Sequence, residues 1–307
     1  MLGAVLGLIS AVFFGANSII TRRGMMRVSS NYVATLTVFT GPVFFFIVGS
    51  LTGDLFKLGQ MPLEAYVYLA LSGITHFALG RTWSYRSVQL LGSTRSNIVT
   101  SLNPVVTIIL AMIILGETIT SIMGIGILCT LLGPLLILLK EEVIQSSSQL
   151  KSNPHGKELD RATLFKGIFY GLGGAFFWGS SAIFIKLGLE HGGYSIAGSF
   201  IAYLSASLTI MPSAFMNKNR RQEMLHGGGK AFRIALLSGL TTNIAQLARY
   251  VAMGLASAIV VSLMQRTMPL WVLIFAFIFN RKYESFSRWV LIGNGLLIVG
   301  TVLILLS

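Results

Sequence analysis

The chain has 307 residues, of which 54% are hydrophobic and only 11% are charged. Soluble domains carry about 25% charged residues, so this chain cannot cover a water-exposed surface of its size. The composition therefore excludes a soluble globular enzyme and indicates an integral membrane protein. The single cysteine, Cys129, lies in an apolar run, which excludes a disulfide framework and a thiolate metal site.

A bilayer-spanning helix needs about 20 mostly apolar residues, and ten segments of the chain meet this requirement. In chain order they cover roughly residues 2–21, 31–52, 63–86, 95–115, 121–139, 164–186, 194–216, 231–254, 257–279 and 288–306. Residues 140–163, after the fifth segment, are polar and rich in serine. The pattern predicts an all-α polytopic membrane protein with ten transmembrane helices, in which this linker joins residues 1–139 to residues 164–307.

The two halves resemble each other in the positions of glycine, tyrosine and proline. The matches are Gly3 with Gly167, Gly7 with Gly171, Gly15 with Gly179, Gly24 with Gly188, Tyr85 with Tyr250, Pro104 with Pro269, Gly126 with Gly293 and Gly133 with Gly300. Their separation drifts only from 164 to 167 residues along the chain. Because each half holds an odd number of spans, the sequence predicts two inverted five-helix repeats.

The positions of the basic residues indicate how the chain is oriented in the membrane. A net charge of +13 would favour nucleic acid as the partner of a soluble protein, but here the basic residues lie between apolar runs. Eighteen of the 23 lysines and arginines lie in or beside odd-numbered connections, whereas only Lys57 and Lys186 belong to even-numbered ones. The positive-inside rule then predicts cytoplasmic odd connections and external termini. We expect the lipid bilayer to surround the chain, and we expect no nucleic-acid partner.

The end of the fourth predicted span carries a resemblance to a known family. Residues 92–118 read GSTRSNIVTSLNPVVTIILAMIILGET, with a proline in mid-helix, an apolar run and then Gly116-Glu117, and residues 257–284 are a weaker copy. This pattern resembles the EamA-type transporters of the drug/metabolite transporter superfamily. The resemblance implies a secondary transporter that moves a small metabolite by alternating access, and we expect it in a prokaryotic inner (plasma) membrane. Studied members are generally drawn with cytoplasmic termini, opposite to the orientation that the charges predict here.

Carriers built from inverted repeats bind substrate near the bilayer midplane, between the repeats. Polar and aromatic residues at matching mid-span positions are therefore the candidates. The predicted substrate-binding residues are Asn17, Arg81, Tyr85, Asn97, Ser101, Trp178, Gln246, Arg249, Tyr250, Gln265 and Arg266. For the polar ones the alternative is a hydrogen bond between helices, and for the aromatic ones it is packing. Pro104 and Pro269 are predicted helix kinks whose freed carbonyls could line a cavity.

Three arginines within spans give the sharpest signal, because a charge at the bilayer centre costs about 3 kcal/mol on insertion scales. Arg266 lies near the middle of the ninth predicted span, whereas Arg81 and Arg249 lie close enough to span ends to reach toward the surface. No Asp or Glu lies deep in any predicted span, so an anionic or carboxylate-bearing substrate is the expected counter-charge. His76 is a candidate for proton coupling, with a hydrogen bond between helices as its alternative.

Two other classes of function stay open at this point. A non-transporting membrane scaffold or a channel is compatible with the repeat. A membrane-embedded enzyme is less favoured, because the sequence has no H-E-x-x-H motif, no P-loop and no paired intramembrane carboxylates. We expect no cofactor and no metal. The expected partners are a small-molecule substrate and a coupling ion or exchanged metabolite, while the oligomeric state is not predicted.

Overall fold

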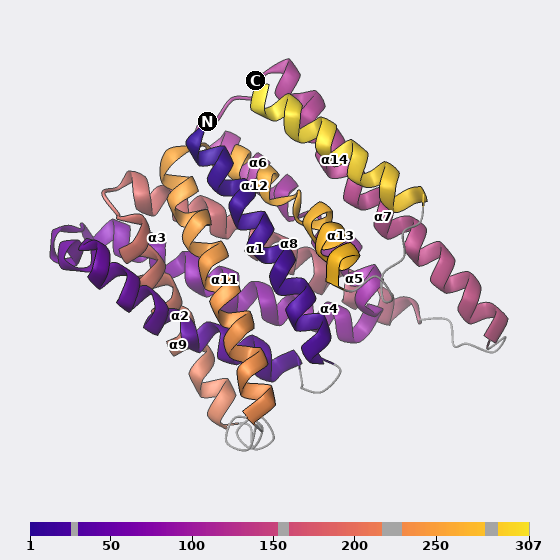
Figure 1. Cartoon of the computed structure of the whole chain (residues 1–307), viewed down its shortest axis with the longest axis horizontal. Coiled ribbons are helices and arrows are strands. Elements are labelled where there is room, and N and C mark those ends of the chain that lie inside the picture. The colour runs from indigo at the N-terminus through magenta and orange to yellow at the C-terminus, as the bar shows by residue number, and fades with distance from the viewer. Residues whose placement is uncertain (26–29, 153–159, 217–228, 280–287, 307) are drawn as a thin grey trace.

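The computed structural model describes residues 1–25, 30–152, 160–216, 229–279 and 288–306, and its regular elements there are all helical (Figure 1). The first half holds α1 (Leu2–Met25), α2 (Ser30–Thr52), the short 3-10 helix η1 (Asp54–Gln60), α3 (Leu63–Gly73), the π-helix η2 (Ile74–Gly80), α4 (Arg81–Leu91), α5 (Ser93–Thr100), α6 (Asn103–Ile114) and α7 (Ser121–Ser152). The second half holds α8 (Arg161–Glu190), α9 (Ser195–Met216), α11 (Gly229–Leu255), α12 (Ala258–Gln265), α13 (Met268–Phe279) and α14 (Arg288–Leu306).

Within the described residues, seven helical stretches are long and apolar enough to cross a membrane. They cover the first, second, fourth, sixth, seventh, ninth and tenth predicted spans. The other three predicted spans are helical as well, but the third changes helix type at η2, the apolar part of α7 is the short stretch Ser121–Ile137, and α11 carries polar residues such as Gln246 and Arg249. The predicted all-α membrane architecture is confirmed.

The segment between the halves is partly helical. The helix α7 continues past its apolar part to Ser152, so the beginning of the predicted linker 140–163 belongs to this helix. The helix α8 begins at Arg161, a few residues before the predicted sixth span. Residues 153–159 lie outside the described part of the chain. The boundaries of the two halves at 139 and 164 stay a prediction.

The matched glycines of α1 and α8 pack against matched partners. A Cβ atom built on either glycine of the first three matched pairs would lie 2.4–2.9 Å from a side-chain atom of the other half. The contacts are Gly3 with Ala256, Gly7 with Met264 and Gly15 with Trp271 in one set, and Gly167 with Leu91, Gly171 with Val99 and Gly179 with Val106 in the other. Each partner in the first set lies 165 residues after its counterpart in the second. The two halves therefore contact each other through equivalent surfaces, as an approximate two-fold axis requires.

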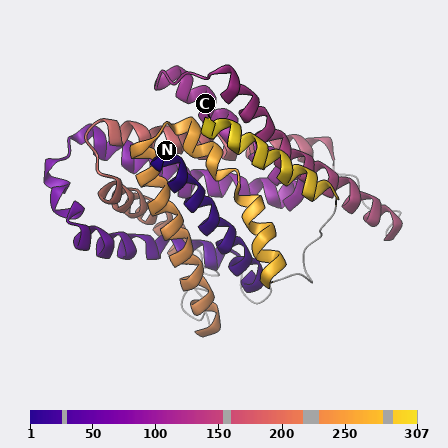
Figure 2. The same cartoon turned by 45° about the horizontal axis from the view of Figure 1, so that its top comes forward.

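The helices α7 and α14 show that the repeats are inverted. They lie side by side in both views (Figures 1 and 2). A Cβ on Gly133 would lie 2.5 Å from the Gly293 carbonyl oxygen, and one on Gly126 would lie 2.9 Å from that of Gly300. Gly126 matches Gly293 in the repeat, and Gly133 matches Gly300. Each glycine thus contacts the counterpart of the other, which requires the two equivalent helices to run antiparallel.

This close approach leads to a stability prediction. Replacing Gly133 with Val places a side chain against the backbone of α14, and such overpacking typically costs about 1–3 kcal/mol. We expect a lower thermal unfolding midpoint for Gly133→Val in detergent. Gly295→Val is the matched control, because a Cβ on Gly295 has no atom of another described helix within 4 Å. Equal midpoints for the two variants would contradict the proposed packing.

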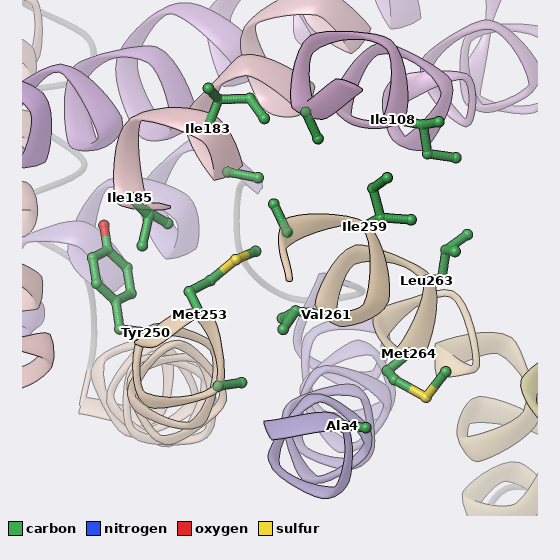
Figure 3. Packing of buried hydrophobic residues seen from close by; sticks show 14 of the residues in the cluster. Ala4, Ile108, Ile183, Ile185, Tyr250, Met253, Ile259, Val261, Leu263 and Met264 are labelled. Carbon is green, nitrogen blue, oxygen red and sulfur yellow. The ribbon is translucent and has the colours of Figure 1, made fainter. Parts of the chain in front are cut away.

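The largest hydrophobic cluster joins both halves at the end of the bundle where α1 begins. Its members labelled in Figure 3 are Ala4, Ile108, Ile183, Ile185, Tyr250, Met253, Ile259, Val261, Leu263 and Met264. On α1, Ala4 belongs to this cluster, whereas Asn17, more than three turns further along, lines a polar cavity. The bundle is therefore closed by apolar packing at one end, and its polar interior lies toward the other.

The beginning of α1 and the end of α14 lie at the same end of the molecule (Figure 1), as an even number of crossings requires. The direction of insertion stays a prediction from the charges. In a Cys129→Ala background, we expect an impermeant maleimide to label Ser307→Cys but not Ser148→Cys in intact cells, because Ser148 lies in the basic, odd-numbered connection. Labelling at position 148 without labelling at position 307 would reverse the orientation.

Candidate substrate site

The fourth and ninth predicted spans are each built from two shorter helices. The helix α5 ends at Thr100 and α6 begins at Asn103, while α12 ends at Gln265 and α13 begins at Met268. Pro104 and Pro269, predicted to kink continuous helices, are instead the second residues of α6 and α13. At that position the missing N–H of proline leaves no hydrogen bond unmade. Both prolines thus start a new helix just after an interruption, and the interruptions occupy equivalent places in the two repeats.

Arg266 lies at the interruption of the ninth span. Its half-buried guanidinium donates a hydrogen bond from Nη2 to Oδ1 of Asn103, at 2.5 Å. Asn103 is the first residue of α6, so this bond joins the two interrupted spans across the repeats. The neighbouring Gln265 donates from Nε2 to the Ser10 hydroxyl of α1, at 2.9 Å. These bonds hold the side chains of residues 265 and 266 in fixed directions.

A second cation, Arg249 of α11, belongs to a buried polar network. Its Nη1 lies 3.3 Å from Nδ1 of His76, and its Nη2 donates to the Ser181 hydroxyl at 3.3 Å. His76 Nδ1 also lies 3.0 Å from the Ser181 hydroxyl, and His76 Nε2 lies 3.3 Å from Nε2 of Gln246. A guanidinium only donates hydrogen bonds, so Nδ1 of His76 accepts from Arg249. The network places a cation 5% exposed beside a neutral acceptor rather than beside a carboxylate.

His76 lies on the π-helix η2, a rare helix form that is frequent at functional sites. Its backbone carbonyl accepts a hydrogen bond from the Trp178 indole, at 3.0 Å. A Cβ on Gly80, the last residue of η2, would lie 2.5 Å from Trp178, so the glycine leaves room for the indole ring. The π-helix and α8 therefore fix both the ring and the backbone of His76.

Two polar cavities meet at Phe14 and His76. The larger, which we name the central chamber, has a volume of about 280 Å³, and the smaller, the second chamber, has about 230 Å³. The predicted residues that line the central chamber are Trp178, Arg249, Gln265, Arg266 and Pro269, with His76. The predicted residues that line the second chamber are Asn17, Arg81, Tyr85 and Gln246, again with His76. The structure thus brings most of the predicted site residues together around one divided space.

The second chamber has one cation and several hydroxyl groups. Arg81 donates from Nη1 to the Ala34 carbonyl at 2.5 Å, and its guanidinium lies 5.8 Å from the centre of the Phe77 ring. The Asn17 side-chain oxygen accepts hydrogen bonds from Ser238 at 2.7 Å and from Thr241 at 3.3 Å. Arg81 is half-buried and faces a polar space that the α1, α2, α4 and α11 helices enclose together with η2.

No Asp or Glu among the described residues lines either chamber. The carboxylates of Glu117 and Asp54 form contacts outside the two chambers. Glu117 accepts hydrogen bonds from the backbone N–H groups of Ala258, at 2.5 Å, and Ile259, at 3.0 Å, and so caps the beginning of α12. Asp54 pairs with Lys57 at 3.0 Å in the short helix η1. The arginines of the chambers therefore have no described side chain of opposite charge beside them.

Three of the predicted substrate-binding residues lie outside both chambers. Tyr250, the repeat counterpart of Tyr85, is 2% exposed in the hydrophobic cluster, with its hydroxyl 2.9 Å from that of Ser72. Asn97 is exposed on α5, and the Ser101 hydroxyl donates to the Ile98 carbonyl of its own turn, at 2.7 Å. Asn97 and Ser101, predicted on the fourth span to bind substrate, therefore lie away from the chambers.

Some residues that line the chambers are absent from the predicted site. Asn103, Thr107 and Ser262 line the central chamber, and Thr242 lines the second. Asn103 had a detectable signal, since an Asn-Pro pair inside an apolar span is a turn signal. Ser262 is the repeat counterpart of Asn97, whereas Thr107 and Thr242 had no signal, because serine and threonine occur on every face of membrane helices.

A family model decides the classification. The model of the EamA-like transporter family matches residues 1–139 and 165–306. The chain belongs to the EamA-like transporter family. A comparison with curated proteins finds no match. One protein of known crystal structure shares the fold, with a TM-score of 0.75 and 13% sequence identity over 99% of this chain and 97% of that one. Membership in the EamA-like family implies secondary transport of a small molecule across a membrane and excludes the enzyme alternative, while it leaves the substrate unspecified.

Proposed function

We propose that this EamA-like protein carries a small anionic metabolite, which binds in the central chamber between Arg249 and Arg266. The observation that supports the proposal is the presence of two guanidinium groups around one cavity of about 280 Å³ that no described Asp or Glu lines. Guanidinium groups bind carboxylates and phosphates through paired, charge-assisted hydrogen bonds. The substrate would supply the negative charge that the chain does not.

Unused hydrogen-bonding groups support a ligand in the space that the two chambers form. Nε of Arg249 and the Thr242 hydroxyl are buried and have no partner among the described residues. Each belongs to a residue that lines one of the two chambers. A buried polar group without a partner costs about 1–3 kcal/mol, so a ligand that pairs with these groups would recover that free energy.

The division of the molecule into a closed and a hollow end fits transport by alternating access. The hydrophobic cluster separates the chambers from the end at which α1 begins, whereas the second chamber lies toward the end of α1 and the beginning of α2. With the orientation that the loop charges predict, this state would face the cytoplasm. In the outward-facing state, the first repeat would adopt the arrangement that the second repeat has here, and the second repeat would adopt that of the first.

A thermal-shift screen of the purified protein against anionic, zwitterionic and cationic metabolites tests the charge class. We expect the unfolding midpoint to rise with anions only, because a ligand that binds the folded state stabilises it. The best anion should then show counterflow in proteoliposomes, where a preloaded internal pool drives uptake of labelled substrate. A rise with cations and none with anions would overturn the proposal, and binding without counterflow would favour a scaffold or a channel.

A further inference from the structure

Asn103 is the direct partner of Arg266, and both ends of its amide are engaged. Its Oδ1 accepts from Arg266, while its Nδ2 donates to the Thr100 carbonyl of the preceding helix α5, at 3.1 Å. Rotating the amide by half a turn would direct an NH₂ group at the guanidinium and an oxygen at a carbonyl. Both contacts would become repulsive, so the structure fixes the orientation of the amide.

The two repeats differ at this position. Asn103 corresponds to Met268 in the second repeat, at the separation of 165 residues that relates the interrupted spans. Arg266 corresponds to Ser101, whose hydroxyl is bonded within its own turn. The Asn–Arg pair therefore occurs on one side of the pseudo-two-fold axis only. The approximate symmetry of the fold does not account for it.

Asn103 holds the guanidinium of Arg266 in place without neutralising its positive charge. An Asp side chain has nearly the same shape as Asn, and it would bind the guanidinium more strongly, because both groups would be charged. It would also cancel the charge of Arg266. The neutral amide oxygen fixes the direction of the guanidinium in the central chamber and leaves its charge available to a ligand.

We propose that Asn103 is a specificity-determining residue, which positions Arg266 in the central chamber and, by being neutral, makes the chamber select an anion. The inference rests on the proposed function and deepens it, because it identifies the residue that keeps the charge of the site uncompensated. Asn103 acts through Arg266, as a positioning residue. An Asp at this position would take the place of the anionic group of the substrate.

The test compares Asn103→Asp with Asn103→Leu in the full-length protein in detergent. The unfolding midpoint is measured first in ligand-free buffer, then over titrations with inorganic phosphate and with succinate. We expect Asn103→Leu to lower the ligand-free midpoint and Asn103→Asp to lower it less, because the carboxylate pairs a half-buried cation although its second oxygen faces the Thr100 carbonyl. We also expect Asn103→Asp to weaken the binding of the anion that stabilises the wild type by about tenfold or more.

A double-mutant cycle separates this role from a purely structural one. In an Arg266→Gln background, Asn103→Asp is expected to lower the ligand-free midpoint further than it does in the wild-type background, because the new carboxylate lacks its partner. Equal falls of the ligand-free midpoint for Asn103→Asp in the two backgrounds would overturn the inference, as would unchanged anion binding by Asn103→Asp. If neither anion stabilises the wild type while the ligand-free cycle behaves as expected, the inferred role in holding Arg266 without neutralising it stands and the choice of anion in the proposed function fails.

Discussion

Arg266→Gln is expected to weaken substrate binding roughly a hundredfold while the protein remains folded. A hydrogen bond to a charged group is worth up to about 3 kcal/mol, and 1.4 kcal/mol corresponds to a tenfold change in Kd. The guanidinium lines the central chamber, and no described carboxylate lines that chamber, so its loss removes a charge that the substrate would pair with. Calorimetry in detergent with the anion identified by the screen measures the change in Kd.

Arg266→Lys separates charge from geometry. Lysine keeps the positive charge but lacks the planar fork that binds two oxygen atoms of a carboxylate or phosphate. We therefore expect an intermediate Kd for this variant. Arg86→Gln is the matched control, because Arg86 is exposed on α4 and lies outside both chambers. If Arg266→Gln binds the anion as tightly as Arg86→Gln does, Arg266 has a structural role and the proposed substrate class is wrong.

The arrangement of helices was accessible from the sequence because it depends on patterns that repeat along the chain. Apolar segments of bilayer length predicted the helices, and the odd number of spans in each half required the inversion. The glycines carried the most specific information, since Gly126 and Gly133 lie where α7 and α14 approach most closely. A side chain at either position would collide with a backbone carbonyl, so their spacing reflects the packing of equivalent helices.

The composition of the chambers was less accessible, because it depends on how each helix is rotated about its axis. Tyr85 and Tyr250 match in sequence, yet the first lines the second chamber and the second is buried in the hydrophobic cluster. A pattern shared by two repeats cannot predict where they differ. The pairing of Asn103 with Arg266 likewise joins residues 163 positions apart across the repeats. No spacing within either half indicates such a contact.

Substitutions of Arg249 and Arg81, the other two arginines that line the chambers, distinguish substrate binding from translocation. Arg249 lines the central chamber beside Arg266, so Arg249→Gln is expected to raise the Kd of the anion by a factor similar to that of Arg266→Gln. Arg81 lines the second chamber and donates to the Ala34 carbonyl. Arg81→Gln should therefore leave the Kd nearly unchanged and slow transport, because an anion that leaves the central chamber would next meet this cation.

Calorimetry and counterflow on the same preparations measure the two quantities. For Arg249→Gln we expect both the affinity and the transport rate to fall, and for Arg81→Gln only the rate. The opposite pattern, with the larger loss of affinity for Arg81→Gln, would place the bound anion in the second chamber. Equal losses of affinity would mean that one ligand reaches both sides of Phe14 and His76, the two residues at which the chambers meet. A substrate of that kind would carry negative charge at both ends, since each chamber offers a guanidinium and neither is lined by a described carboxylate.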